Sequence, residues 1–212
     1  MCRVWVFAGA ILCYLLGSIP FGYIITRGLR NIDIRNHGSG NVGATNVFRV
    51  VGPIPGISVF ILDMLKGLTA VIFIAGLVLR TEPCIDTTLL RLIYAVACVC
   101  GHNWTIFLNF KGGKGMATSA GVIIGLSLKI PSLGMIFLLC MGFWVLILLI
   151  SGTVSLASIA AAFLLPIFMV VFNQSLELII FAVALCLFAI YRHKTNISRL
   201  LRGEEKKFFR KP

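Results

Sequence analysis

The chain has 212 residues, of which 59% are hydrophobic and only 12% are charged, and its mean hydropathy is +1.02. This composition excludes an ordinary soluble globular domain and is typical of a protein that lies in a lipid bilayer. The net charge is +12. In so apolar a chain, the excess predicts basic loops on the cytoplasmic side of a membrane rather than nucleic-acid binding, for which the sequence shows no motif.

Long apolar runs divide the chain into membrane-spanning candidates. A transmembrane helix needs roughly 20 mainly apolar residues, so we expect an all-α bundle of about seven such helices and a single domain over residues 1–212. The expected spans are residues 4–26, 53–79, 88–110, 115–128, 131–150, 154–172 and 175–191. The fourth is short, and we expect it to tilt, to pack inside the bundle or to be partly re-entrant.

The basic residues predict the orientation. Arginines fall between the first two spans, Lys111 and Lys114 fall between the third and fourth, and the segment from Arg192 to Lys211 is rich in Lys and Arg. The opposite side would carry few cations, among them Arg80 and Lys129. The positive-inside rule therefore places the N-terminus outside and the C-terminus in the cytoplasm.

The polar segment 33–49, after the first span, has the composition of a phosphate-binding loop. Its glycines would let backbone N–H groups approach an anion, its hydroxyl and amide side chains offer hydrogen bonds, and an arginine offers a planar bidentate donor. The alternative is a polar loop that uses its glycines for tight turns. The candidate ligand-binding residues are Gly38, Ser39, Gly40, Asn41, Asn46 and Arg49.

A second segment places glycines and two lysines directly before an apolar helix. Backbone amides at a helix N-terminus, together with a cation, form an anion site. A Walker A loop is excluded, because Leu108 stands where its first glycine would be and Gly115 follows Lys114. Alternatively, the lysines extend to the membrane interface. The candidates are Lys111, Gly112, Gly113, Lys114 and Gly115.

The last third of the chain adds polar groups at helix spacing. Ser155 and Ser158 would share one helix face and point at a ligand, or else serve as interhelical hydrogen-bonding groups. His193 and Asn196 have the same spacing at the start of the basic tail. Glu205 interrupts that tail and could pair with arginines.

Two charged residues, Asp63 and Lys66, lie within the second span, where charge is costly unless it is paired or faces water. Either a functional role or a mutual ion pair that fixes the bundle explains them. His102, near the end of the third span, is either a hydrogen-bonded packing residue or a proton-transfer group. The sequence shows no cluster with metal-ligand spacing, and we expect neither a metal nor a cofactor.

Taken together, these motifs resemble one family closely and nearly from end to end: the bacterial membrane-integral acyl-phosphate:glycerol-3-phosphate acyltransferases. The resemblance implies a seven-helix enzyme of the bacterial cytoplasmic (inner) membrane, with its active site on the cytoplasmic side. It implies transfer of a fatty acyl group from acyl phosphate to the 1-hydroxyl of glycerol 3-phosphate, which gives lysophosphatidic acid and phosphate. The matching segments are residues 17–22, 38–49, 62–67, 101–103, 110–115 and 192–196.

The resemblance also implies residue roles. The functional residues of the family fall on Ser39, Arg49, Lys114, His193 and Asn196, and a structurally important glutamate falls on Glu205. Both Ser155 and Ser158 match the serine contributed after the fifth span. Membrane lipids, glycerol 3-phosphate and acyl phosphate are the expected partners. A small organic-phosphate transporter is the alternative. A transporter would carry polar groups near mid-membrane and on both faces, whereas nearly all the candidate groups here fall on one predicted face, with Asp63 and Lys66 the main exceptions.

Overall fold

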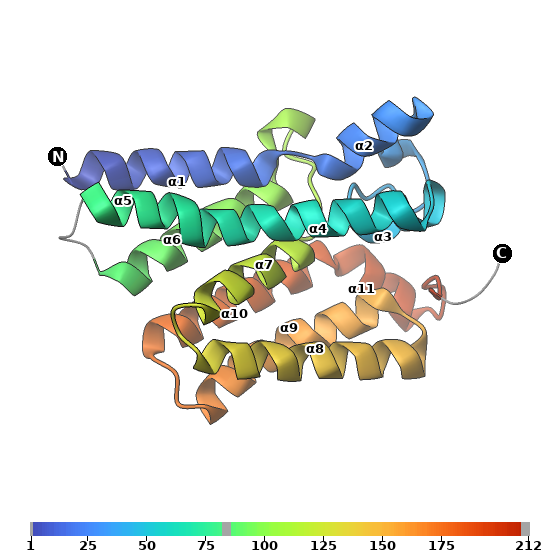
Figure 1. Ribbon diagram of the computed structural model, residues 1–212. Coiled ribbons are helices and arrows are strands. Elements are labelled where there is room, and N and C mark those ends of the chain that lie inside the picture. The colour runs from blue at the N-terminus through green and yellow to red at the C-terminus, as the bar shows by residue number, and fades with distance from the viewer. Residues whose placement is uncertain (1, 82–85, 209–212) are drawn as a thin grey trace. The chain divides into compact units, whose positions relative to one another are not determined.

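The computed structural model describes residues 2–81 and 86–208, and all regular structure within these ranges is helical (Figure 1). Two basic residues of the tail, Arg210 and Lys211, lie outside the described residues. The chain divides into two compact units, one up to Lys129 and one from Ile130 onward. The sequence predicted one domain over residues 1–212, and the division into two compact units does not test that prediction.

The first unit contains most of the polar segments. Its elements are α1 (Cys2–Ser18), α2 (Phe21–Arg30), η1 (Ile34–Asn36), α3 (Ala44–Val50), α4 (Pro53–Thr69), η2 (Ala70–Ile74), α5 (Ala75–Thr81), α6 (Thr87–Asn103), η3 (Ile106–Leu108) and α7 (Met116–Ser127). The main packing partners are α1 with α6 and α4 with α7, and α3 packs against α4. The second unit comprises α8 (Ser132–Ser151), α9 (Val154–Val171), α10 (Leu176–Arg192) and α11 (Lys194–Leu201), with α9 between α8 and α10.

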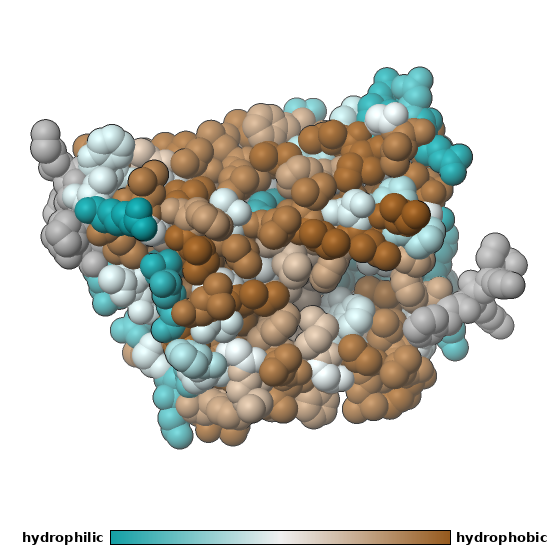
Figure 2. Space-filling model, viewed as in Figure 1, coloured by the Kyte–Doolittle hydropathy of each residue, from teal (hydrophilic) through white to brown (hydrophobic). Residues whose placement is uncertain are grey.

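The predicted all-helical membrane protein is confirmed. Among the described residues, five helical stretches are long and apolar enough to cross a membrane, and α10 with α11, bent by 61°, would make a sixth. The expected short fourth span corresponds to α7, an apolar helix of 12 residues. Apolar side chains dominate the face drawn in Figure 2, as lipid contact requires. The exact number of seven spans and their orientation stay predictions.

Two expected spans contain breaks that hydropathy does not indicate. The first run is interrupted at Ile19 and Pro20, because proline has no N–H to continue the helix. The third run was expected to reach residue 110, but α6 ends at Asn103 and Thr105 begins a new turn by accepting a hydrogen bond from the Phe107 amide. These two breaks are joined, since the Thr105 hydroxyl donates to the Ser18 carbonyl at 2.5 Å.

Glycines allow the main helices of the first unit to approach closely. A Cβ at Gly17 would lie 2.0 Å from the Cys98 carbonyl oxygen, and one at Gly101 would lie 2.1 Å from the Tyr14 carbonyl oxygen. The α4–α7 pair uses Gly67 and Gly121 in the same way. Small residues at such contacts are the usual means by which membrane helices gain packing energy without a hydrophobic driving force between them.

A π-helical turn, η2, joins α4 to α5 within one continuous helical stretch. Such turns release backbone carbonyls from their regular partners. Arg91 of α6 donates to the carbonyl of Val71 in this turn. The arginine therefore supplies a hydrogen bond to an irregular backbone that lipid would not satisfy.

We predict that Gly121→Ala destabilises the protein by about 1–3 kcal/mol, because the new methyl group would overpack the α4–α7 contact. Its Cβ would lie 1.8 Å from the Met64 carbonyl oxygen. Gly76→Ala is the matched control, since a Cβ at position 76 would have no neighbouring atom within 4 Å. Thermal unfolding in detergent compares the two variants, and an equal Tm for both would contradict the packing argument.

Candidate active site

The segment between α2 and α3 is folded around the side chain of Asn46. The Asn46 Oδ1 accepts from the Ser39 amide at 2.8 Å, and its Nδ2 donates to the carbonyls of Asn41 and His37 at 2.8 and 3.0 Å. Asn46 itself is buried, with 2% of its surface exposed. These bonds lie within the segment, so the geometry favours a role for Asn46 in shaping the loop over direct contact with a ligand.

The glycines of this segment meet specific backbone requirements. Gly38 and Gly40 have φ values of 64° and 74°, which L side chains rarely adopt. A Cβ at Gly38 would also lie 2.2 Å from Asn46 Oδ1. Asn41 turns the chain by accepting from the Gly43 amide at 2.8 Å. Between these turns, Ser39 is exposed, so its hydroxyl is accessible to a small polar ligand.

The two arginines near this loop differ in their surroundings. The Arg35 guanidinium is bound to Asp33, with Nη2 to Oδ2 at 2.6 Å and Nε to Oδ1 at 3.0 Å. The hydrogen bonds from the Arg35 side chain lower the pKa of the Asp33 carboxyl below its ordinary value. The Asp33–Arg35 pair therefore contributes its full stabilisation of the folded state at pH values above the pKa that Asp33 has in the unfolded chain. This contribution is lost as the pH falls through the lower pKa that Asp33 has in the folded protein. Arg49 lies on α3, about one turn after Asn46, and is partly buried.

The glycine–lysine segment, residues 111–115, lies against the end of α6. The Gly113 amide donates to the His102 carbonyl at 3.0 Å, and the Gly112 amide donates to the Asn103 carbonyl at 3.2 Å. Gly115, with a φ of 76°, is the N-cap residue directly before α7. Lys111 is exposed and Lys114 is partly buried. The segment thus presents a cation directly before a helix N-terminus, the arrangement expected of an anion site.

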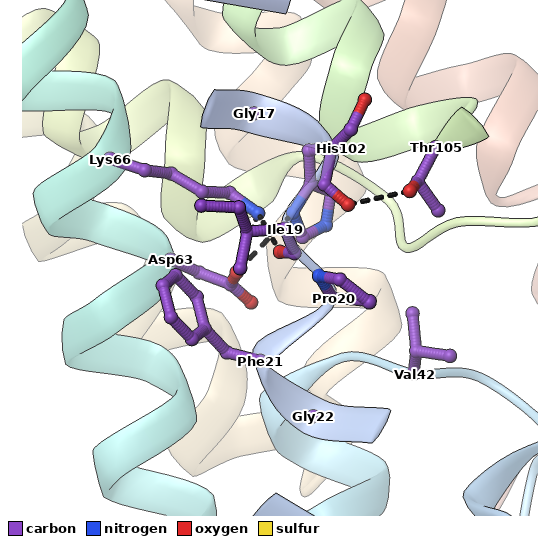
Figure 3. Close-up of a pocket in the computed structure, with 11 residues that line it drawn as sticks. Gly17, Ile19, Pro20, Phe21, Gly22, Val42, Asp63, Lys66, His102 and Thr105 are labelled. Carbon is purple, nitrogen blue, oxygen red and sulfur yellow. Dashed lines mark hydrogen bonds and ion pairs between the residues drawn. The ribbon is translucent and has the colours of Figure 1, made fainter. Parts of the chain in front are cut away.

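A buried cluster of titratable side chains, formed by Asp63, Lys66 and His102, lines a small pocket together with Val42 of the first polar segment (Figure 3). Lys66 Nζ is 2.8 Å from Asp63 Oδ1 and donates to the Ile19 carbonyl at 3.2 Å. His102 Nδ1 lies 3.5 Å from the same Asp63 oxygen. The side chains of these three titratable residues are 2–7% exposed. Asp63 and Lys66 therefore form the ion pair that their spacing allowed, and His102 joins it.

The second unit contains a separate polar cluster around Glu205. Its Oε1 accepts from the Ser155 hydroxyl at 2.8 Å and from Asn196 Nδ2 at 2.6 Å, and its Oε2 lies 3.0 Å from Arg199 Nε. The Glu205 side chain is 7% exposed. The carboxylate therefore joins α9 and α11 to the tail. A short backbone bond supports the closure, from the Phe208 amide to the Gly152 carbonyl at 2.6 Å.

His193 and Ser158, two further predicted residues of the second unit, are also buried. His193 lies at the bend between α10 and α11, where its Nδ1 is 2.7 Å from the Ala189 carbonyl oxygen. Ser158 accepts from Trp144 Nε1 at 3.1 Å. The two serines left open by the sequence thus have different surroundings: Ser155 belongs to the Glu205 cluster with Asn196, whereas Ser158 bonds to α8.

The predicted residues are divided between the two compact units. The first unit holds Asp63, Lys66 and the segments of Ser39, Arg49, Lys111 and Lys114. The second holds Ser155, Ser158, His193, Asn196 and Glu205. Sequence reasoning missed Ser18 and Thr105, which link the two helix breaks of the first unit. The sequence showed only common polar residues there, although Thr105 closely follows His102 and Asn103. Within the described ranges, no group of three or more His, Cys, Asp or Glu side chains could hold a metal.

These features define a helical membrane protein with glycine- and cation-containing segments suited to phosphorylated ligands. The chain belongs to the glycerol-3-phosphate acyltransferase family, whose model matches residues 7–203. A glycerol-3-phosphate acyltransferase of Desulforamulus reducens is 43% identical over 198 residues, which cover 93% of this chain and 92% of the relative. The predicted family is therefore confirmed.

Crystal structures support the same relationship. PlsY (YgiH), described as an integral membrane glycerol 3-phosphate acyltransferase, matches in its glycerol 3-phosphate form with a TM-score of 0.82 and 39% identity, covering 96% of this chain and 95% of that one. Its lysophosphatidic acid form matches with a TM-score of 0.79 and 38% identity, covering 95% and 94%. The similarity thus extends over both compact units.

We predict that Glu205→Ala lowers the free energy of unfolding by about 2–4 kcal/mol, because it leaves buried partners of a charged group unmatched. Glu204→Ala is the control, since Glu204 forms an exposed pair with Arg202 in which the side chains are 58% and 60% exposed. Exposed pairs contribute roughly 0–1 kcal/mol. Chemical or thermal unfolding in detergent measures both, and equal losses would argue against the Glu205 cluster as a structural closure.

Proposed function

We propose that this protein transfers a fatty acyl group from acyl phosphate to the 1-hydroxyl of glycerol 3-phosphate. The products are lysophosphatidic acid and inorganic phosphate, and the reaction begins phospholipid synthesis. The observation that carries the proposal is the glycine–lysine segment docked on α6 directly before α7, in a chain of the glycerol-3-phosphate acyltransferase family. The glycerol 3-phosphate and lysophosphatidic acid forms of PlsY support this choice of substrate and product.

The proposed reaction balances without a cofactor. The 1-hydroxyl oxygen attacks the acyl carbon, the bond from that carbon to the phosphate oxygen breaks, and the departing phosphate takes the hydroxyl proton. Acyl phosphate is an activated mixed anhydride, so catalysis needs mainly alignment and stabilisation of negative charge. Alignment contributes roughly 7–11 kcal/mol to lowering such a barrier, and one oxyanion donor contributes about 3–4 kcal/mol.

The residues of the first unit suit the electrostatic part of this chemistry. We assign the donor's phosphate to Lys114 and the N-terminus of α7, and we assign stabilisation of developing negative charge to Arg49 as well. Lys114 is partly buried, where a cation attracts phosphate more strongly than it does in bulk water. Lys111, which is exposed, would add to the attraction of an anion from solution.

Positioning of glycerol 3-phosphate is assigned to Ser39, and His193 and Asn196 keep the functional roles that the family resemblance predicts. Ser39 is exposed on a loop whose backbone is fixed by Asn46. Asn196 is oriented by Glu205, and the same carboxylate binds Ser155. A side chain that is held by a buried partner keeps the geometry that alignment requires.

We propose that the active site faces the cytoplasm of a bacterial inner membrane. The segments that carry the proposed phosphate-binding groups are also those in which the loop and tail cations are concentrated. Lys and Arg are retained on the cytoplasmic side of membrane proteins. Glycerol 3-phosphate would then reach the site from the cytoplasm, and the acyl chain would enter from the lipid.

Phosphate release by purified protein in lipid tests the activity. With palmitoyl phosphate, we expect release that depends on glycerol 3-phosphate and matches lysophosphatidate formation. Arg49→Ala and Lys114→Ala should each lower kcat/KM by about 10²–10³-fold, as loss of an oxyanion donor does. Arg30→Ala and Lys129→Ala, both at exposed cations, are the matched controls. Unchanged kinetics in both test variants would remove the electrostatic assignment.

The choice of donor gives a separate prediction. Palmitoyl phosphate should support lysophosphatidate formation, whereas palmitoyl-coenzyme A should give no product above background. The thioester lacks the phosphate next to the acyl carbon, and this phosphate is the group that we expect Lys114 to bind and the hydroxyl proton to reach. Mass spectrometry of the lipid product distinguishes the donors. Equal rates with the thioester would contradict the proposed donor while leaving acyl transfer intact.

A further inference from the structure

His102 touches the glycine–lysine segment through both its backbone and its ring. Its carbonyl accepts from the Gly113 amide at 3.0 Å. A Cβ placed on Gly113 would lie 2.1 Å from His102 Nε2 and 2.9 and 3.0 Å from ring carbons, so the three nearest atoms all belong to the imidazole. The ring therefore forms the surface against which the backbone of Gly113 rests.

The ring is in turn held by the buried ion pair of α4. His102 Nδ1 lies 3.5 Å from Asp63 Oδ1, and Lys66 lies 2.8 Å from that same oxygen. Lys66 also donates to the carbonyl of Ile19 at the break between α1 and α2. The imidazole is thus set between the carboxylate on one side and the glycine backbone on the other, as the close-up in Figure 3 shows for its Asp63 side.

Helix packing alone does not account for these residue types. Gly67 and Gly121 already bring α4 and α7 into close contact, and charged groups within a membrane span are costly even when they are paired. What the cluster adds is a fixed position for the imidazole, and through it for residues 112 and 113. Side chains that orient a binding segment need directional interactions such as hydrogen bonds and ion pairs, which apolar packing does not supply.

We propose that Asp63, Lys66 and His102 form a positioning unit that sets the geometry of residues 111–115 for binding the phosphate of the acyl donor. The inference rests on the proposed function and extends it to residues that do not themselves contact substrate. Asp63 orients the ring, Lys66 fixes Asp63 and the α1–α2 break, and the ring supports Gly113. The Gly112 and Gly113 amides stay bonded to the end of α6, and this anchor keeps Lys114 and the N-terminus of α7 in the arrangement that an anion requires.

A pair of compensating substitutions at Gly113 and His102 tests this proposal directly. Gly113→Ala should raise the KM for palmitoyl phosphate by about tenfold to a hundredfold, since misplacement by about 1 Å has effects of that size. The KM for glycerol 3-phosphate should stay within about twofold of wild type. Asparagine at position 102 keeps an amide near the Nδ1 position but lacks the rest of the ring. His102→Asn combined with Gly113→Ala should therefore recover much of the donor affinity lost by Gly113→Ala alone.

Gly112→Ala is the matched control for this pair of substitutions. Its Cβ would meet the backbone, 2.1 Å from the His102 carbonyl oxygen and 2.9 Å from the Asn103 carbonyl oxygen. Removing the imidazole gives no room there, so His102→Asn should not rescue Gly112→Ala. Equal rescue of both alanine variants, rescue of neither, or a parallel rise in both KM values would overturn the positioning role.

Hydrogen–deuterium exchange provides a readout that does not depend on turnover. In Asp63→Asn and His102→Gln, the amides of residues 112 and 113 should exchange faster than in wild type, while amides in the second unit keep their protection. Unchanged protection of the glycine–lysine segment would refute the inference even if the enzyme is active. Faster exchange in a protein whose wild type releases no phosphate from palmitoyl phosphate would uphold the positioning unit and refute the proposed donor.

Discussion

The buried pair of Asp63 and Lys66 is the constraint on which the first unit depends. A lone charge at this depth would be strongly disfavoured, so each residue needs the other. The pair also satisfies groups beyond itself: Lys66 reaches the Ile19 carbonyl at a helix break, and Asp63 lies beside His102. One ionic contact in α4 therefore joins α1, α2 and α6 at the point where the chain leaves regular helix.

Close backbone approach is the second requirement, and glycine provides it in two ways. At Gly17, Gly101, Gly67 and Gly121, the missing side chain lets one helix touch the carbonyls of another. At Gly112 and Gly113, it lets a loop bind the end of α6 through its amides. The rigid helix pairs therefore hold a loop that ends in a lysine directly before a helix N-terminus, the arrangement expected of an anion site.

Hydropathy and motif order predicted the all-helical membrane fold and the family, because both signals extend over most of the chain. The breaks at Pro20 and after Asn103 were not predicted. Pro20 is a local cause that hydropathy does not register, whereas the bond from Thr105 to Ser18 joins residues far apart in sequence. The π-helical turn at Ala70–Ile74 was also not predicted. The Val71 carbonyl in this turn accepts a hydrogen bond from Arg91 of another helix, and a contact between helices is not visible in the local sequence.

The candidate site shows the same limit. Residue types and glycine spacing indicated phosphate-binding segments, yet they did not separate residues that would touch substrate from residues that shape the loop. Asn46 illustrates this, because its amide bonds join four positions of its own segment. Ser155 and Ser158 were equivalent by spacing, and only the position of Glu205 and Trp144 in the fold distinguishes them.

The fate of one oxygen atom tests the central claim most directly. Purified protein in lipid would be given palmitoyl phosphate and glycerol 3-phosphate carrying oxygen-18 at the 1-hydroxyl, and the products would be analysed by mass spectrometry. Attack of that hydroxyl on the acyl carbon predicts labelled lysophosphatidate together with unlabelled inorganic phosphate. Labelled glycerol bisphosphate with free palmitate would instead show attack at phosphorus, and would contradict acyl transfer.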